Sequence, residues 1–542
     1  MFECVPAGLL LATLTTPVIL LAVSPRLAYL VLCGYVVYWA LRSIGMAIRQ
    51  ANEFFRMRRY KRIDWHARLA HLTDPFDRLA VLAGRTTLGH DDIEEREALL
   101  AWVHADANVP SPDELHHLIV LPVANESAEI VVQTLDALAD ADYDSDKLLI
   151  CLSFEGRSVA WSADKIAEVT GPYLGRFGML LTTQHPDALL GEARVKGANT
   201  TWAARTARVE LRKRGIPDEH VVVSAFDCDT RPSPHYFQVL SYTHLTNPGR
   251  DRDSYQPILL FHNNVWHVPA PSRLVGYIAS MWTMVDSTQP ARLRLFSSHA
   301  MGLRALVDVG FWSTNVIPDD SRQYWRMYFS SDGRAVTRPL HTAVYLDSVH
   351  ADGYLASLRE QYRQIRRWAY GVIDFPYVMR HNLTNGRIPV GVKVVQTYRQ
   401  LSQFHQWAMT PIMVMVARWL IGLLAPGVQT PHFIYGRGQI HLGPGFGLVD
   451  LAGWMYALTP VITLGSMLVG VVVALALLPH RPADRSGWAY ARLAAEWLLL
   501  PIVVPIFFCF PAIDAQIRLA ARRYLGFQVT VKSRFGQGHQ LR

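Results

Sequence analysis

The sequence predicts a protein of two parts: an α/β domain with a parallel sheet covered by helices, and a domain of membrane-spanning α-helices. Of the 542 residues, 50% are hydrophobic and only 18% are charged, which is an unusually apolar balance for a soluble protein of this length. In the middle of the chain, short apolar runs alternate with stretches of helical period, whereas longer apolar runs occur at both ends. A chain of this length is expected to form two or three structural units.

The N-terminal region contains two apolar segments, residues 6–23 and 27–46. Each is close to the roughly 20 residues that cross a bilayer, so we expect a transmembrane hairpin within residues 1–48. No Lys or Arg precedes the first segment and the second follows at once, which disfavours a cleaved signal peptide. The basic stretch 49–62 comes next, and basic residues accumulate on the cytosolic side of membranes.

The net charge of +8 is compatible with binding to nucleic acid, to anionic lipid or to a phosphorylated substrate. No nucleic-acid-binding signature accompanies the basic stretch, so membrane lipid is the expected partner and nucleic acid is not. The five cysteines are scattered and lack CxxC spacing, which predicts neither a zinc site nor a disulfide framework.

The middle of the chain predicts the α/β domain. After a cytosolic helical linker (49–114), a domain over 115–345 contains four apolar runs of strand length, with helical patterns at 126–139 and 201–214 between them. The expected strands are 116–122, 147–154, 177–183 and 220–226. Ligands of such sheets bind beyond the carboxyl ends of the strands.

The C-terminal third returns to membrane character. Interfacial helices are expected over 346–402, membrane helices over 403–513, and a basic tail over 514–542. The apolar runs are 404–426, 448–478 (broken by Pro460) and 493–513. Three crossings after a cytosolic domain would leave the basic tail outside, against the positive-inside tendency. One resolution is that the run around Pro460 crosses or re-enters twice, and the sequence leaves the parity open.

The stretch SAFDCDT places Asp227 and Asp229 directly after a predicted buried strand. In an extended chain these alternate side chains point the same way, so both carboxylates can converge on one hard cation that bridges phosphates. The alternative is a solvated turn in which the aspartates cap backbone amides.

Other polar residues follow apolar runs in a similar way. Asn125 and Glu126 follow the first predicted strand. Lys196 and Asn199 are expected in a loop just before a helix, where an amine and the N–H groups of the helix could bind a phosphate. Asp319 and Asp320 follow another short apolar run.

Downstream, Gln364, Arg367 and Trp368 occur at i, i+3 and i+4, which puts all three on one face of a helix. An amide, a fixed cation and a flat aromatic ring suit a sugar that carries a diphosphate. An amphipathic interfacial helix with Trp and Arg at the membrane edge is an equally good interpretation of this segment alone.

Taken in order, P-x-x-N-E, K-G-x-N, D-x-D, an acidic pair and Q-x-x-R-W resemble the membrane-integrated family 2 glycosyltransferases, which include cellulose, chitin and hyaluronan synthases. The resemblance covers roughly residues 115–375. It implies a cytosolic catalytic domain of the GT-A (Rossmann-like) fold, held in the cell (inner or plasma) membrane by a multi-pass helical domain. The implied activity is an inverting hexosyltransferase that moves a sugar from a nucleotide-sugar, most simply a UDP-sugar, to a polysaccharide or lipid acceptor.

The resemblance also implies roles for individual residues. Asp227 and Asp229 would hold Mg²⁺ or Mn²⁺ and through it the donor diphosphate. Asp320 would be the general base for the acceptor hydroxyl. The remaining implied contacts are with the donor (Asn125, Glu126, Glu155 and Lys196) and with the acceptor or leaving diphosphate (Asp319, Gln364, Arg367 and Trp368). Glu155 is the one acid in the stretch where the family usually has D-D-G-S or D-G-S.

Three other functions stay open. The enzyme could be a non-processive glycolipid glycosyltransferase. It could instead be a transporter or scaffold with a nucleotide-binding domain, although the apolar segments hold few ionisable residues (Arg418, Asp450, Glu496). A membrane nucleotidyl- or phosphotransferase would use Asp227 and Asp229 but has no evident need for the Q-x-x-R-W face. Both of these non-glycosyltransferase classes predict that Asp320→Asn leaves activity largely intact.

Overall fold

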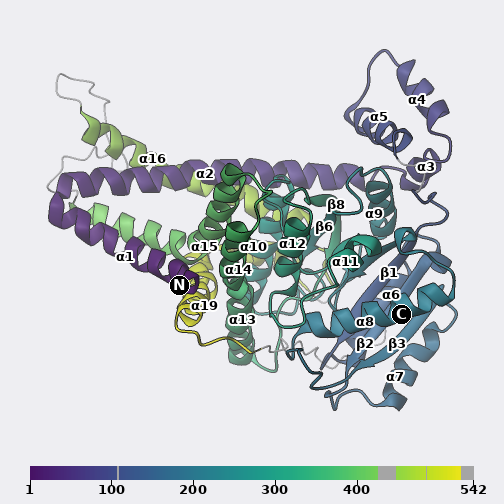
Figure 1. The fold of residues 1–542 in the computed structure, drawn as a ribbon. Coiled ribbons are helices and arrows are strands. Elements are labelled where there is room, and N and C mark those ends of the chain that lie inside the picture. Colours follow the sequence, from purple (N-terminus) through teal and green to yellow (C-terminus); the bar gives the residue numbers. More distant parts are fainter. Residues whose placement is uncertain (106–108, 425–446, 484, 527–542) are drawn as a thin grey trace.

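The computed structural model describes residues 1–105, 109–424, 447–483 and 485–526. An α/β domain lies on one side of the molecule, and long apolar helices extend from it to the other side (Figure 1). This is the predicted fold class, and the structure confirms it. Part of the expected basic tail, residues 527–542, lies outside the described residues.

The sheet has eight strands in the order β3-β2-β1-β4-β7-β6-β8-β5. The four predicted strands form its parallel half: β1 (His116–Val123), β2 (Leu148–Glu155), β3 (Met179–His185) and β4 (Val221–Ala225). The other half adds β5 (Arg231–Pro232), β6 (Ser254–Leu260), β7 (His299–Gly302) and β8 (Thr337–Tyr345). Because β7 runs antiparallel to both β4 and β6, the sheet is mixed, and the expectation of a wholly parallel sheet is wrong.

The parallel half is buried on both faces, which explains its continuous apolar runs. In β1, Ile119 and Leu121 pack into one hydrophobic cluster, whereas Leu118 and Val120 pack into another on the opposite face. The helices of the domain are α6 (Ala128–Ala139), α7 (Ala163–Thr170), α8 (Lys196–Lys213), α9 (Tyr236–Leu245), α10 (Ala270–Ser287), α11 (Leu303–Asp308), α12 (Asp319–Ser330), α13 (Tyr354–Ala369) and α14 (Asp374–Thr384).

Helix α8 begins earlier than the sequence suggested. Lys196 and Asn199 lie in its first turn and not in a preceding loop, which corrects the expectation. The early start depends on Gly197, because a Cβ there would lie 2.3 Å from the carbonyl oxygen of Ser313 and 2.9 Å from the Cβ of Asp319. The missing side chain lets the start of α8 pack closely against the segment that leads into α12.

Within the described residues, five segments are long and apolar enough to cross a membrane. They are α1 (Val5–Val23), α2 (Pro25–Tyr60), α15 (Val390–Leu424), α16 (Leu448–Ala476) and the interrupted run of α17 (Ala489–Glu496), α18 (Leu500–Val504) and α19 (Phe510–Ala520). Helix α2 continues through the predicted basic stretch and reaches a small helical group of α3 (Trp65–Ala70), α4 (Pro75–Ala83) and α5 (His90–Val103) (Figure 1).

Pro460 does not break α16, so the proposal that this run crosses twice is wrong. A proline has no N–H to offer the carbonyl four residues earlier. Here the hydroxyl of Thr459 donates to the carbonyl of Tyr456 at 2.7 Å, which satisfies that carbonyl. The helix therefore continues as one element through the proline.

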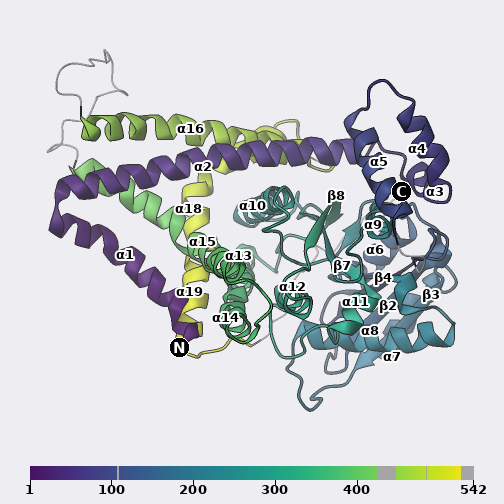
Figure 2. The ribbon, with the colours of Figure 1, turned by 45° about the horizontal axis from the view of Figure 1, so that its top comes forward.

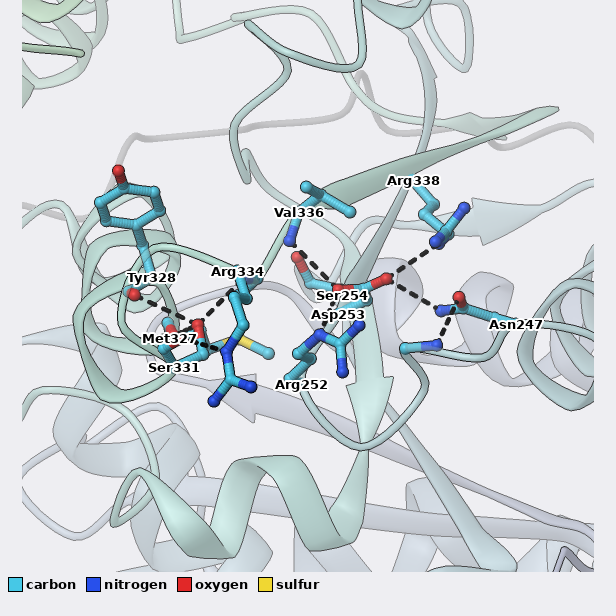
Figure 3. Close-up of polar contacts among 12 residues, drawn as sticks. Asn247, Arg252, Asp253, Ser254, Met327, Tyr328, Ser331, Arg334, Val336 and Arg338 are labelled. Carbon is cyan, nitrogen blue, oxygen red and sulfur yellow. Dashed lines mark hydrogen bonds and ion pairs between the residues drawn. The ribbon is translucent and has the colours of Figure 1, made fainter. Parts of the chain in front are cut away.

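The parallel strands β6 and β8 are joined at their N-terminal ends by buried Asp253 (Figure 3). Its carboxylate accepts from the backbone N–H of Val336 (3.1 Å), Nε of Arg338 (2.9 Å) and Nδ2 of Asn247 (3.2 Å). Since these partners satisfy the buried charge, we assign Asp253 a structural role that fixes the strands at the end opposite their carboxyl termini.

Candidate functional site

Asp227 follows β4 at the carboxyl edge of the sheet. One carboxylate oxygen accepts from Nζ of Lys196 at the start of α8, and the other accepts from the hydroxyl of Ser297, which precedes β7. The side chain of Asp227 is 33% exposed, and that of Lys196 is 20% exposed. A carboxylate and an amine from distant segments thus meet at a solvent-accessible point.

Asp229 is nearly buried, at 3% exposed. Its Oδ2 accepts the backbone N–H of Asp347, just beyond β8, at 2.7 Å. Its own carbonyl accepts from Nδ2 of Asn263, just beyond β6, at 3.0 Å. The D-x-D segment is a turn and not the expected extended chain, since the N–H of Thr230 donates to the carbonyl of Asp227 at 2.9 Å. Asp229 caps a backbone amide, as the alternative predicted, but it is buried and ties together the carboxyl ends of three strands.

Asp319 and Asp320 are the first two residues of α12. Burial raises the pKa of both carboxyls, and for Asp320 the neighbouring Asp319 raises it further while Lys196 opposes the rise, to about 7. Because Asp227 also raises the pKa of both carboxyls, the three acids lie close enough to interact. A carboxyl that titrates near neutral pH suits a group that takes up a proton during turnover.

The start of α12 is held by a buried carboxylate that the sequence analysis did not identify. Asp374, at the start of α14, is fully buried and accepts from the hydroxyl of Ser321 at 2.6 Å and from Nε of Arg322 at 2.7 Å. The guanidinium of Arg322 also lies 4.1 Å from the ring centroid of Tyr377. These contacts fix the helical turn that carries the acidic pair.

The Q-x-x-R-W residues lie on α13, as the helical spacing predicts. Gln364 is buried and its Oε1 accepts from Nε2 of Gln361 at 3.0 Å. Trp368 is half-buried and its ring lies 5.7 Å from that of Phe261, which follows β6. Arg367 lies between these two residues in the sequence and faces the acids described above.

The two cations share the same acidic partners. Burial lowers the pKa of Lys196, but the carboxylates of Asp227, Asp319 and Asp320 outweigh burial, and the pKa lies above its ordinary value. Burial also lowers the pKa of Arg367, against the opposing effect of the same three acids and of Glu126. Six residues that are far apart in the sequence therefore form one electrostatic cluster. We call it the acid–cation cluster, and its members are Glu126, Lys196, Asp227, Asp319, Asp320 and Arg367.

The other residues that are expected to contact the nucleotide-sugar donor lie at the ends of β1 and β2. Glu126 accepts the backbone N–H of Ala124 at 2.7 Å, and Asn125 is exposed and accepts from the hydroxyl of Ser158 at 3.0 Å. Glu155 is buried at the end of β2, 3.2 Å from Nε of Arg157. It also lies 3.7 Å from Nδ1 of His185, so its contacts are with residues at the ends of β2 and β3.

The carboxylate chemistry of the site fits a hard divalent cation. In the acid–cation cluster four carboxylates face two cations; burial is the main cause of the raised pKa values of Asp319 and Asp320, and neighbouring carboxylates add to it. Oxygen ligands of this kind suit Mg²⁺ or Mn²⁺ when phosphate oxygens complete the coordination. Within the described residues, no group of three or more His, Cys, Asp and Glu side chains is arranged to hold a metal alone.

Three residues that hold the cluster in place were not identified from the sequence. Ser297 is an ordinary serine in a loop, and Asp374 with Arg322 forms an ion pair that links residues 52 positions apart. An acid and an arginine on two different helices leave no distinctive pattern in the sequence. Only the tertiary structure reveals their contact.

No protein-family model matches the chain, and no curated protein matches it either. Among solved structures, the mannosyltransferase PcManGT from Pyrobaculum calidifontis, in complex with GDP-Man and Mn²⁺, is similar with a TM-score of 0.37 and 15% identity, over 76% of this chain and 98% of that chain. TarS 1–349 from S. aureus, in complex with UDP-GlcNAc, has a TM-score of 0.31 and 10% identity, over 79% of this chain and 98% of that chain.

GalNAc-T7, with UDP, GalNAc and Mn²⁺, has a TM-score of 0.31 and 9% identity, over 56% of this chain and 57% of that chain. Similarity at these TM-scores and identities does not assign a function.

Proposed function

We propose that the chain is a membrane-bound glycosyltransferase that moves a sugar from a nucleotide-sugar to a polysaccharide or lipid acceptor. The observation that carries this proposal is the acid–cation cluster, together with Trp368 on the same helix as Arg367. A pair of cations beside a carboxyl of near-neutral pKa provides charge stabilisation for a leaving diphosphate and a base for an acceptor hydroxyl.

In the proposed reaction, the acceptor oxygen attacks the anomeric carbon of the donor sugar from the side opposite the leaving group, so the configuration inverts. Asp320, as carboxylate, takes the proton of that hydroxyl. The bond between the anomeric carbon and the diphosphate oxygen breaks, and the nucleoside diphosphate leaves with both electrons. Arg367 and Lys196 stabilise the negative charge that develops on the leaving oxygen, and Trp368 provides a flat surface for a sugar ring.

Asp227 and Asp229 would hold Mg²⁺ or Mn²⁺, which would supply further charge neutralisation at the donor phosphates. Lys196, which donates to Asp227 in this structure, would then donate to a phosphate oxygen. Asn125, Glu126 and Glu155 lie at the ends of β1 and β2, where the nucleotide would be held.

We further propose that four of the five apolar segments cross the membrane and that the fifth, Ala489–Ala520, lies along its cytosolic face. Its first part is tied to the α/β domain, because Glu496 accepts from Arg273 of α10 at 2.6 Å. Its last part is tied to the same domain, because Asp514 accepts from Arg366 of α13 at 3.0 Å. A segment with both ends on one domain does not cross.

The path of the segment agrees with this assignment. Figure 2 shows α18 and α19 running across the direction of α2 and α16 and ending beside the N-terminus. Pro501, Pro505 and Pro511 interrupt the segment, with a π-helical turn at Pro505–Cys509. Four crossings put both termini and the α/β domain on one side, which satisfies the positive-inside tendency that three C-terminal crossings would violate.

Labelling of single cysteines tests the topology. In a background without the native cysteines, Ser24→Cys in the α1–α2 turn should react with a membrane-impermeant maleimide only from outside the cell. Arg523→Cys, an exposed position just after α19, should react only in inverted membranes, because a crossing by Ala489–Ala520 would place it outside. Reaction of both sites from the same side would contradict the four-crossing arrangement.

The activity is tested with purified membranes, a panel of labelled nucleotide-sugars and Mg²⁺ or Mn²⁺, with release of nucleoside diphosphate as the measurement. We expect turnover of at least one donor, its loss in Asp320→Asn, and its retention in Asp251→Asn, an exposed loop control. Undiminished turnover in Asp320→Asn would favour a nucleotide-binding or phosphotransfer function, and no turnover of any donor by folded protein would contradict the proposal.

A further inference from the structure

A cavity of about 240 Å³ lies between α13 and the C-terminal end of α19, and four arginines line it. We call it the arginine pocket and define it by Arg363, Arg366, Arg367 and Arg518. The one carboxylate among the lining residues is Glu360, which is paired with Arg363. The lining therefore has more positive than negative groups, which is the character of a binding site for an anion.

Two of the arginines are held in place by one carboxylate. Asp514 of α19 accepts from Arg366 at 3.0 Å and from Nε of Arg518 at 2.7 Å. Each guanidinium carries several N–H donors, and its bond to Asp514 uses only one of them. A planar guanidinium fixed in this way matches the oxygen atoms of a phosphate better than a flexible amine does.

The pocket adjoins the acid–cation cluster. Arg367 lines the pocket and also interacts with the acids of the cluster. Ile317, which also lines it, is separated from the acidic pair only by Pro318. A molecule whose anionic group occupied the pocket would therefore lie next to Asp320, the proposed base.

The outer wall of the pocket belongs to the membrane domain. Helix α19 exposes Phe510 and Ile517, at 49% and 54%, and Ile517 directly precedes Arg518. Tyr524, also in the lining, donates to Glu3 at the start of the first apolar segment at 3.0 Å. An apolar helix face that ends at a cluster of arginines is the arrangement that suits a lipid with a phosphate headgroup.

We propose that the arginine pocket binds the phosphate of a membrane lipid that serves as the acceptor, a proposal that rests on the glycosyltransferase function above. Arg363, Arg366 and Arg518 hold the lipid phosphate and take no part in bond making, Arg367 stays with the donor diphosphate, and a hydroxyl of the same lipid gives its proton to Asp320. A free nucleoside diphosphate offers the same phosphate chemistry. The lipid is favoured because the expected nucleotide contacts lie at the ends of β1 and β2, whereas α19 forms the outer wall here.

The test uses full-length protein in phosphatidylcholine nanodiscs with and without phosphatidic acid, and separately measures binding of UDP and GDP. The variants are Arg518→Gln and Arg363→Gln, with Arg518→Lys as a variant that keeps the charge without the planar fork. The matched control is Arg359→Gln, an exposed arginine one turn away on α13 and outside the lining. Thermal midpoints establish that each variant is folded.

We expect each Gln variant to weaken phosphatidic acid binding about tenfold, with nucleoside diphosphate binding unchanged. Arg518→Lys should show a smaller loss, and Arg359→Gln should match the wild type. Weaker binding of the nucleoside diphosphate with unchanged lipid binding would assign the pocket to the leaving group and overturn the proposal. Equal binding of both ligands in all folded variants would overturn it as well.

The outcome separates this proposal from the proposed activity. If the wild type binds phosphatidic acid through Arg518 but turns over no nucleotide-sugar, the pocket is supported as a phosphate site and the acceptor role is overturned. If donor turnover depends on Asp320 but lipid binding does not depend on Arg518, the activity is supported and the pocket proposal is overturned.

Discussion

Asp320→Asn should abolish turnover and at the same time stabilise the folded protein above neutral pH. Burial and Asp319 raise the pKa of this carboxyl from 3.8 to about 7, so the folded protein holds its proton more tightly than the unfolded chain does. Ionising Asp320 therefore costs folding free energy. This cost is absent below the unfolded pKa, grows as the pH rises, and is complete above the folded pKa near 7.

The magnitude follows from the two pKa values. The interval between 3.8 and about 7 corresponds to about 4 kcal/mol, which is an upper limit. Asp319 and Lys196 share the titration with Asp320, so removing one carboxyl lets its neighbours readjust, and we expect a gain of about 2 kcal/mol. The carboxylate of Asp320 accepts a hydrogen bond from the backbone N–H of Ser321 at 2.7 Å. The side-chain oxygen of an asparagine can accept the same bond.

The assay is thermal unfolding of purified protein in detergent between about pH 3 and about pH 9, an interval that brackets both pKa values. Asp320→Asn should unfold a few degrees above the wild type at pH 8 and at the same temperature at the acidic end, while donor turnover falls by about 10²- to 10⁴-fold. The exposed Asp251→Asn should follow the wild type throughout. Equal midpoints of Asp320→Asn and wild type at pH 8 would refute the reasoning, because the buried carboxylate would then carry no cost.

Three further predictions concern neighbouring groups. Donor turnover by the wild type should rise with pH through an apparent pKa near 7, and Lys196→Met should move that rise to higher pH, because Lys196 lowers the pKa of Asp320; an unmoved pH–rate profile would exclude this coupling. Asp374→Ala should destabilise the protein by about 3 kcal/mol, measured by denaturant unfolding, because Arg322 would remain buried without its carboxylate; a value near zero would show that Arg322 finds another partner. EDTA should abolish turnover and Mg²⁺ or Mn²⁺ should restore it, with Asp227→Asn requiring more cation; full turnover in EDTA would exclude the divalent ion.

The sequence predicted the parallel half of the sheet well because those strands are buried on both faces and appear as continuous apolar runs. The start of α8 was misplaced because Lys196 and Asn199 are polar, and nothing local shows that Gly197 packs against Ser313. Pro460 was misread as a break because the compensating bond from Thr459 depends on a side-chain rotamer and not on residue type. Local patterns reveal burial, whereas close approaches and compensating bonds appear only in three dimensions.

The site residues show the same division. Asp227 and Asp320 could be proposed from sequence because acids after apolar runs suggest the carboxyl edge of a sheet. The anchoring pair Asp374 and Arg322 could not, because both residues lie within ordinary amphipathic helices. The arginine pocket was hidden for another reason: Arg518 lies far from α13 in the sequence, and its partner Asp514 lies in a segment that looked like a membrane span.

One hydrophobic cluster explains why the site and the membrane helices form a unit. Val195 and Ala198 flank Lys196, and Ile317 precedes the acidic pair, yet all three pack in the same cluster as residues of α1, α15 and α19. Gly371, just after α13, lies so close to α15 that a Cβ there would be 3.2 Å from the ring of Phe404. The positions of the proposed phosphate ligands and base therefore depend on packing against the membrane domain, so a soluble fragment without α15 and α19 would lack the support that brings these groups together.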